Sequence, residues 1–232
     1  LNVKSLIFLY VFLSSSLLGS VSDFIYPKSS APSFSNYGTV GLIQMPSARF
    51  HPEGSLAFSW TDMDPYLRGS IVAYPFEWFE ASYQYIDINN ALYSDIAVFS
   101  GSQTYKDKSF SAKFRLLKER YFLPQLAIGF RDLAGTGVFT SEYLVASKKI
   151  SNVDLSLGIG WGMMSENTIR NPFINIGDRF KSRELNSSKS TGGSINYDSF
   201  FGGPAGLFGG AEIIIPNSKS LRVKVEYDSI DY

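Results

Sequence analysis

Apolar and polar residues alternate strictly in two neighbouring stretches of the chain, residues 109–116 and 126–131. A period of two is typical of extended strands that have one apolar and one polar face. The charged residues 118–120 interrupt the pattern, which predicts a hairpin although no Asn-Gly or Asp-Gly turn is present. The first strand sets apolar residues against small or cationic ones: Phe110, Ala112, Phe114 and Leu116 against Ser109, Ser111, Lys113 and Arg115.

Similar alternation recurs along most of the chain and predicts eight or nine strands in all. Residues 139–146 are ambiguous, because 141–149 also fit a short helix, and we favour the strand. Residues 95–100 are a candidate for a further short strand within the polar connection 87–108, and a long polar insertion covers 163–201. The clearer strands outside the hairpin are 55–61, 67–74, 78–86, 153–162, 206–215 and 221–228.

An apolar sheet face meets either a second sheet or lipid, so the pattern fits a soluble sandwich or a transmembrane barrel. Strand lengths favour the barrel, since they approach the roughly 9–11 residues of a tilted membrane-spanning strand. The insertion 163–201 is unusually long for a compact soluble domain but ordinary for an outer barrel loop. Aromatic residues also lie near strand ends, as in interfacial girdles: Trp60, Tyr74, Trp78, Tyr121, Phe122, Trp161 and Tyr227.

The predicted fold class is therefore all-β, an antiparallel transmembrane β-barrel formed by residues 54–232. Residues 1–22 have the positive start, apolar core and small cleavage residues of a secretory signal peptide. Their apolar run is short of the roughly 20 residues that the alternative, a membrane-spanning helix, needs. Residues 23–53 read as a linker and a turn that enters or plugs the barrel. Because the chain starts with Leu and stops directly after a strand, we expect a fragment of a longer protein and an incomplete barrel.

Composition restricts the chemistry further. Charged residues make up 18% of the chain, below the roughly 25% of soluble domains, and a net charge of zero gives no reason to expect a nucleic-acid partner. Without cysteine, the sequence can form no disulfide and carries no lipid on cysteine. The single histidine, His51, stands in a turn, and neither a G-x-S-x-G elbow nor a set of metal ligands accompanies it. We therefore expect no enzyme activity, cofactor or metal.

The polar face of the predicted sheet carries the candidate binding residues. In a barrel these side chains face the lumen, where cations on adjacent strands attract an anionic polymer. The alternative is that the cations pair with carboxylates such as Glu226 and Asp228 and fill the interior, and the sequence leaves both open. The candidates are Lys113, Arg115, Arg131, Arg222, Lys224, Glu80 and Gln84.

Two runs near the start, Y-G-T-V-G-L-I-Q-M-P-S-A-R-F at 37–50 and P-E-G at 52–54, resemble the YjbH-like family. Residues 141–148 (S-E-Y-L-V-A-S-K) and 157–162 (L-G-I-G-W-G) are also similar to it. The resemblance implies a Gram-negative outer-membrane β-barrel linked to exopolysaccharide and group 4 capsule biosynthesis, without catalytic residues to carry over. Members of that family are often longer than this chain, and several look like lipoproteins, which a sequence without cysteine does not match.

Pattern and resemblance together predict a non-enzymatic outer-membrane protein that takes part in exopolysaccharide or capsule biosynthesis or export. The expected partners are outer-membrane lipid, an extracellular polysaccharide and other polysaccharide export proteins. Two alternatives stay open: a general porin-like channel for small solutes, and a secreted carbohydrate-binding or carbohydrate-active β domain. Loss of exopolysaccharide in a deletion strain separates the export role from the porin, and membrane fractionation separates it from the secreted domain.

Overall fold

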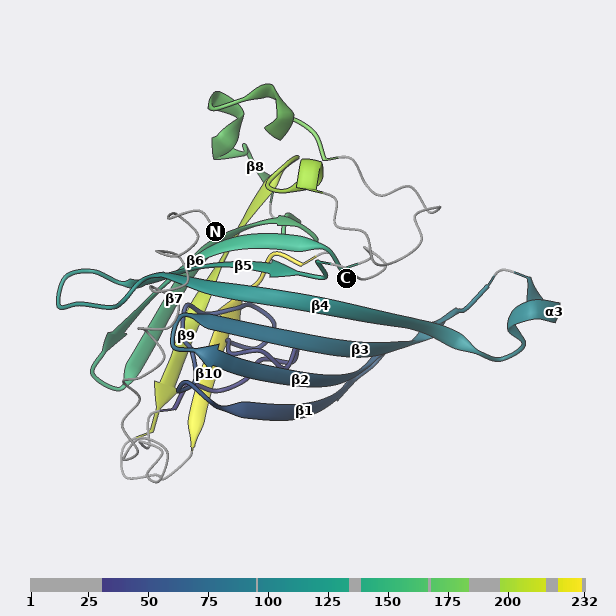
Figure 1. Ribbon diagram of the computed structural model, residues 1–232, viewed down its shortest axis with the longest axis horizontal. Helices are drawn as coiled ribbons and strands as arrows, with labels where there is room; N and C mark the ends of the chain where they lie inside the picture. Colours follow the sequence, from purple (N-terminus) through teal and green to yellow (C-terminus); the bar gives the residue numbers. More distant parts are fainter. Residues whose placement is uncertain are drawn as a thin grey trace, which may run out of the picture.

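One antiparallel sheet, curved and twisted, forms most of the molecule (Figure 1). The computed structural model describes residues 31–94, 96–133, 139–166, 168–183, 197–215 and 221–230. The expected signal peptide, residues 1–22, lies outside the described residues. The strands are β1 (Leu56–Met63), β2 (Tyr66–Phe76), β3 (Phe79–Leu92), β4 (Thr104–Leu117), β5 (Gln125–Arg131), β6 (Ser141–Ile150), β7 (Val153–Gly162), β8 (Thr168–Ile169), β9 (Ala205–Ile214) and β10 (Arg222–Tyr227).

Strands that follow one another in the chain are neighbours in the sheet, in the order β1-β2-β3-β4-β5-β6-β7-β9-β10, and the short β8 pairs with β9. Every pairing is antiparallel. The hydrogen-bonded path runs from β1 to β10, and these two strands are not paired with each other within the described residues. The all-β antiparallel class is thus confirmed, whereas closure of the sheet into a barrel stays a prediction.

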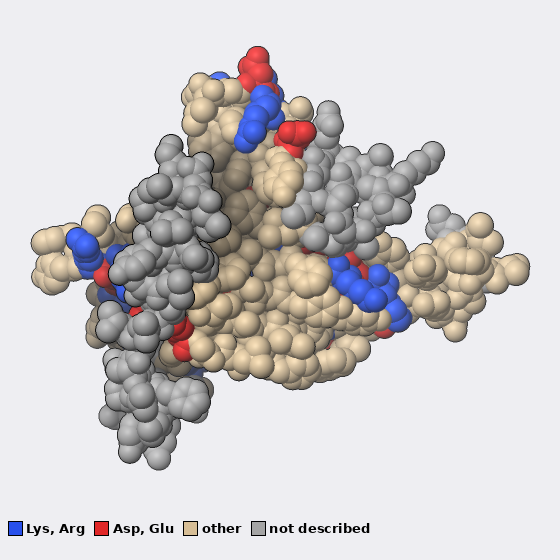
Figure 2. Space-filling model, in the orientation of Figure 1, with Lys and Arg blue, Asp and Glu red and all other residues tan. Residues whose placement is uncertain are grey.

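The apolar side chains of the alternating pattern lie on the outer face of the sheet. Phe110, Leu157 and Val223 expose 54%, 67% and 45% of their surface, and no second layer formed by the described residues covers them. On the face shown in Figure 2, charged side chains gather at the margins and leave a broad uncharged surface between them. This arrangement is the reverse of a soluble sandwich, whose apolar face is covered. Other exposed apolar side chains on this face are Leu56, Phe58, Trp60, Ile71, Leu155, Leu207, Val225 and Tyr227.

Residues 33–50, which we call the plug segment, lie against the inner face of the sheet and fill its curve (Figure 1). The segment folds back on itself, with a backbone hydrogen bond from Asn36 N to Ile43 O (2.7 Å). At its first turn Gly38 has a φ of 74°, and a Cβ there would lie 2.5 Å from Ser70 Cβ on β2. Glycine alone fits this close approach to the sheet without strain.

The core lies between the plug segment and the inner face, and it is more apolar than the sequence pattern suggests. Met45 of the plug segment belongs to a buried cluster that includes Tyr143 of β6 and Phe208 of β9. The girdle predicted at the strand ends is wrong for Tyr74 and Trp161, which are both fully buried. Tyr74 falls on the inward phase of β2, where it joins the core. Trp161 falls on the outward phase but is covered by the connection that follows it.

That covering connection, residues 163–204, contains the polar insertion predicted at 163–201, and described residues of it lie over the outer face at one end of the sheet. Phe173 stacks on Trp161 with ring centroids 5.3 Å apart. Arg183 holds Glu142 of β6 through two nitrogen–oxygen contacts of 2.8 and 2.9 Å. Besides β8, the described part of this connection contains three 3-10 turns: η1 (Pro172–Asn175), η2 (Asp178–Phe180) and η3 (Tyr197–Ser199).

The hairpin of β3 and β4 is longer than predicted. Both strands have 14 residues, so much of the supposed polar connection 87–108 continues the ladder, with Lys106 Nζ 3.0 Å from Asp87 Oδ2 across it. The short strand expected at 95–100 is wrong, because residues 97–100 form the helical turn α3 (Ala97–Ser100). A chain that reverses direction between two paired strands cannot stay extended there. The ambiguous segment 139–146 belongs to strand β6, as favoured above.

Connections differ in length between the two ends of the sheet. At one, the short-turn end, β2–β3, β4–β5, β6–β7 and β9–β10 are separated by at most seven residues. The other end, which we call the long-connection end, has the connections 93–103, 132–140 and 163–204. The two-residue turn 64–65 is the one short connection there. All short connections but one therefore fall on the same side of the sheet.

Candidate functional site

A buried ion pair occupies the inner face of the sheet beside the plug segment. The antiparallel register places Glu80 of β3 directly opposite Lys113 of β4, with 3.1 Å between Lys113 Nζ and Glu80 Oε2. The lysine and glutamate side chains are 1% and 2% exposed. The ammonium also donates to the carbonyl of Arg49 (2.8 Å), and the carboxylate accepts from the N–H of Val40 (3.4 Å). The lysine and the glutamate therefore each bind the plug segment in addition to pairing with each other.

Three more of the predicted site residues bind the carbonyl groups of the plug segment. Arg131 Nη2 donates to Gln44 O at 2.9 Å, and its guanidinium lies 4.1 Å from the centre of the Tyr37 ring. Gln84 Nε2 donates to Tyr37 O at 2.8 Å. Lys224 Nζ donates to three carbonyls, those of Phe34 (2.8 Å), Gly41 (3.0 Å) and Leu42 (2.7 Å).

Glu226 of β10 binds the opposite kind of group on the same segment. Its carboxylate accepts from three successive backbone N–H groups, those of Ile43 (2.7 Å), Gln44 (2.9 Å) and Met45 (2.9 Å). Successive amides that converge in a turn form a concave site for an anion. The sequence analysis named Glu226 only as a partner for cations, because its true partner is a turn far away in the chain.

The P-S-A-R run at the end of the plug segment contacts the short-turn end of the sheet. Arg49 makes two parallel contacts of 2.8 Å with Asp154 of β7 and a third of 2.6 Å with Glu119. Just before it, Ala48 N donates to Ser147 Oγ at 2.8 Å. Sequence reasoning missed Arg49 as a functional residue. The available signal was its place in the run that carries the family resemblance.

His51, which the sequence analysis placed in a turn, follows the plug segment and packs among aromatic rings. Its imidazole stacks on Phe34 with centroids 4.7 Å apart and lies 5.3 Å from the Tyr74 ring. Burial lowers the pKa of His51, an effect that nearby Glu80 opposes and Lys113 supports. The neutral imidazole is therefore the form that the folded protein accommodates.

We expect acidification to destabilise the fold through His51. Both folded and unfolded chains carry a neutral imidazole at pH 8. As the pH falls below about 6.5, the unfolded chain takes up a proton that the folded chain resists, so stability decreases. His51→Phe keeps the ring stack and should reduce the difference in urea midpoint between pH 8 and pH 5. Equal pH dependence of the variant and the wild type would contradict this role.

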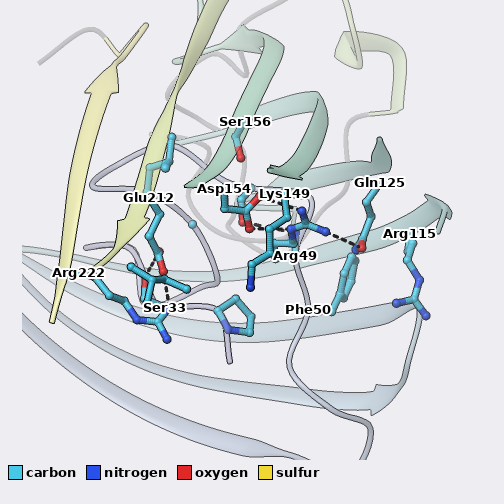
Figure 3. A pocket seen from close by; sticks show the side chains of 15 residues that line it. Ser33, Arg49, Phe50, Arg115, Gln125, Lys149, Asp154, Ser156, Glu212 and Arg222 are labelled. Atoms are coloured by element: carbon cyan, nitrogen blue, oxygen red, sulfur yellow. Dashed lines mark hydrogen bonds and ion pairs between the residues drawn. The ribbon is translucent and has the colours of Figure 1, made fainter. Parts of the chain in front are cut away.

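A pocket of 280 Å³ lies between the plug segment and the short-turn end of the sheet (Figure 3). Two predicted site residues, Arg115 and Arg222, line it from β4 and β10. Arg222 binds Glu212 and donates to Ala31 O at 2.6 Å. The other two cations that line this pocket, Arg49 and Lys149 at the end of β6, were both missed by the sequence analysis. Lys149 lies beyond the strand predicted at 139–146, so its inward phase was not recognised.

The structure thus divides the seven predicted site residues into two groups. Five of them bind the plug segment directly, and Arg115 and Arg222 lie at the pocket. A role for any of them in binding a glycan stays a prediction. Residues 31–230, apart from the undescribed stretches, contain no group of three or more His, Cys, Asp or Glu side chains placed to hold a metal ion. No helix in the described part of the chain has the length and apolar character needed to cross a membrane.

Residues 33–232 match the model of the YjbH family, described as "Exopolysaccharide biosynthesis protein YbjH". A curated relative, the "Uncharacterized lipoprotein YjbH" of Escherichia coli (strain K12), is 44% identical over 208 residues. The match covers 89% of this chain but 29% of that relative, so the chain spans less than a third of the relative's length. No solved structure matches the fold.

Proposed function

Because the chain belongs to the YjbH family of exopolysaccharide biosynthesis proteins, we propose that it forms part of an exported outer-membrane β-barrel that supports exopolysaccharide or capsule biosynthesis or export. The observation that carries the membrane location is the uncovered apolar outer face, on which Phe110 and Leu157 stand more than half exposed. In water this face would favour aggregation, whereas lipid covers it without cost.

The two ends of the sheet support the same proposal. Outer-membrane barrels have short turns on the periplasmic side and longer loops outside. The short-turn end of this sheet, with its connections of at most seven residues, then faces the periplasm. The long-connection end, including the connection ordered by Arg183 and Glu142, faces the cell exterior. The lipoprotein name of the Escherichia coli relative also favours a membrane-associated exported protein.

The role that we propose is non-enzymatic. The buried Lys113 and Glu80 hold each other and the plug segment, which gives this ion pair a structural part in the fold. The plug segment bridges the two edges of the sheet, since Asn36 Nδ2 contacts Met63 Sδ of β1 and the Ile43 N–H binds Glu226 of β10. A segment in this position controls what passes along the inner face and completes the wall between the edges.

A charge on the outer face tests the membrane location. Leu157→Arg, in the middle of β7, should lower stability by about 2–4 kcal/mol and reduce the heat-modifiable outer-membrane form, because arginine is costly at the bilayer midplane. Ile150→Arg, at the end of β6 and 58% exposed, is the matched control, with an expected cost of about 0–1 kcal/mol near the interface. If Leu157→Arg is as stable as the wild type, the face does not meet lipid.

The polysaccharide role has its own test. A strain that lacks the gene should make less surface polysaccharide, and expression of the wild-type protein should restore it. Unchanged polysaccharide combined with altered uptake of small solutes would favour the porin alternative.

A further inference from the structure

The pocket at the short-turn end carries positive charge that the protein does not neutralise. Each of the two carboxylates that line the pocket forms an ion pair with a neighbouring arginine: Asp154 with Arg49, and Glu212 with Arg222. Lys149 points its ammonium into the pocket (Figure 3) and has no ion-pair partner among the described residues. The positive charge that stays unneutralised in the pocket therefore comes from Lys149 and Arg115.

Arg115 supplies the second part of this surplus. Its side chain is 14% exposed, and among the described residues its ion pair is with Glu77, at 3.2 Å from Nη2 to Oε2. Glu77 is itself half exposed and shared with Lys118 at 2.5 Å, so it neutralises Arg115 incompletely. The hydrogen bond from Lys118 is the main cause that lowers the pKa of Glu77, so this carboxylate belongs mostly to Lys118. Arg115 keeps N–H groups available to the pocket.

Arg115 also lines a second pocket, of 260 Å³, on its other side. There Phe76 and Trp78 are stacked with centroids 5.3 Å apart and an interplanar angle of 7°. The first pocket contains Phe50, whose ring centre lies 5.6 Å from the Arg115 guanidinium. Each pocket thus combines an aromatic ring with the same arginine. Their volumes lie just below the roughly 300–1,000 Å³ of pockets for drug-sized ligands, so each suits one sugar unit of a chain.

We propose that these two pockets bind neighbouring units of an acidic oligosaccharide, with a sugar carboxylate held by Lys149 and Arg115. The planar guanidinium matches a carboxylate through two hydrogen bonds, and the ammonium of Lys149, two strands away in the sheet, adds a point charge. This inference rests on the proposed function for its ligand class. The pockets lie at the short-turn end of the sheet, which the proposed function assigns to the periplasm. A polysaccharide on its way out reaches the periplasm before it crosses the membrane. Lipid of the outer leaflet lies at the opposite end of the sheet.

Binding to the purified full chain in detergent tests this site. The probe is a hexamer of galacturonic acid, with maltohexaose as the neutral counterpart, measured by titration calorimetry at low salt. The acidic hexamer should bind, and maltohexaose should bind at least tenfold more weakly. Lys149→Gln and Arg115→Gln should each weaken binding about tenfold, the usual effect of removing a hydrogen bond to a charged group.

Lys181→Gln is the matched control, because it removes the same charge at the long-connection end, where Lys181 pairs only with Asp178 in the described structure. It should leave binding unchanged. The site is wrong if the wild type does not bind the acidic hexamer, if maltohexaose binds equally well, or if neither pocket variant weakens binding. Complete displacement by an equal concentration of inorganic phosphate would likewise overturn the assignment to a sugar acid.

The two proposals fail independently. Absence of binding in a protein whose deletion abolishes surface polysaccharide contradicts the site alone. Specific binding in a protein whose deletion leaves polysaccharide unchanged contradicts the proposed function and leaves the site standing.

Discussion

Lys113→Met should lower the free energy of unfolding by about 3–5 kcal/mol, because it leaves the Glu80 carboxylate buried without its countercharge. The carbonyl of Arg49 loses its donor in the same step. The loss should appear as a lower urea midpoint, followed by intrinsic tryptophan fluorescence of the purified full chain in lipid vesicles. Glu80→Gln should have an effect of similar size, since it leaves the buried ammonium uncompensated instead.

Lys108→Met is the matched control for this pair. Lys108 lies on the same strand, β4, but its side chain is on the outward phase and exposed. Removing its charge should change stability by no more than about 0.5 kcal/mol. If Lys113→Met and Lys108→Met change the free energy of unfolding equally, the ion pair of Lys113 and Glu80 does not stabilise the docked plug segment.

Glu226→Ala should loosen the turn at residues 43–45 from β10 and cost about 3 kcal/mol or more. Three backbone N–H groups, from Ile43 to Met45, lose one shared acceptor, and each amide left without a partner costs about 1–3 kcal/mol. The turn should then become accessible to protease while the strands stay folded. Limited proteolysis with mass spectrometry should detect cleavage within residues 33–50 before cleavage elsewhere.

Glu166→Ala provides the comparison for Glu226→Ala. Glu166 is exposed at the long-connection end, and its substitution should leave the cleavage pattern unchanged. If Glu226→Ala is as resistant to protease within residues 33–50 as the wild type, the contacts of Lys224 and Arg131 suffice to hold the segment.

The sequence predicts which side chains of each clean strand share a face, because a period of two is a local property of the chain. Phe110 and Lys113 accordingly lie on opposite faces, as expected. The pattern fails where another segment covers a residue. Trp161 continues the outward series of β7 and is nevertheless buried, because Phe173 stacks on it from a connection whose path the alternation does not specify.

The partners of the inner face were less predictable for the same reason. Residue types indicated correctly that Lys113 and Glu80 would lie on the polar face, but Lys113 and its partner carbonyl at Arg49 are 64 residues apart in the chain. The surplus cation Lys149 was missed because the favoured strand, 139–146, stopped short of it, while the alternative helix covered 141–149. The residue types in the sequence show which side chains need a hydrogen-bond or ion-pair partner. Which residue becomes that partner depends on the three-dimensional fold.

The plug segment precedes β10 in the chain, but it can dock fully only after β10 has formed. The carbonyls of Phe34 and Leu42 bind Lys224 across separations of 190 and 182 residues, and the N–H of Ile43 binds Glu226 across 183. Closing loops of this length before intervening strands pair has a large entropic cost, and distant contacts form slowly. Docking of residues 33–50 therefore reports that β10 has joined the sheet, because the segment is held only after a strand that follows it by more than 170 residues has paired.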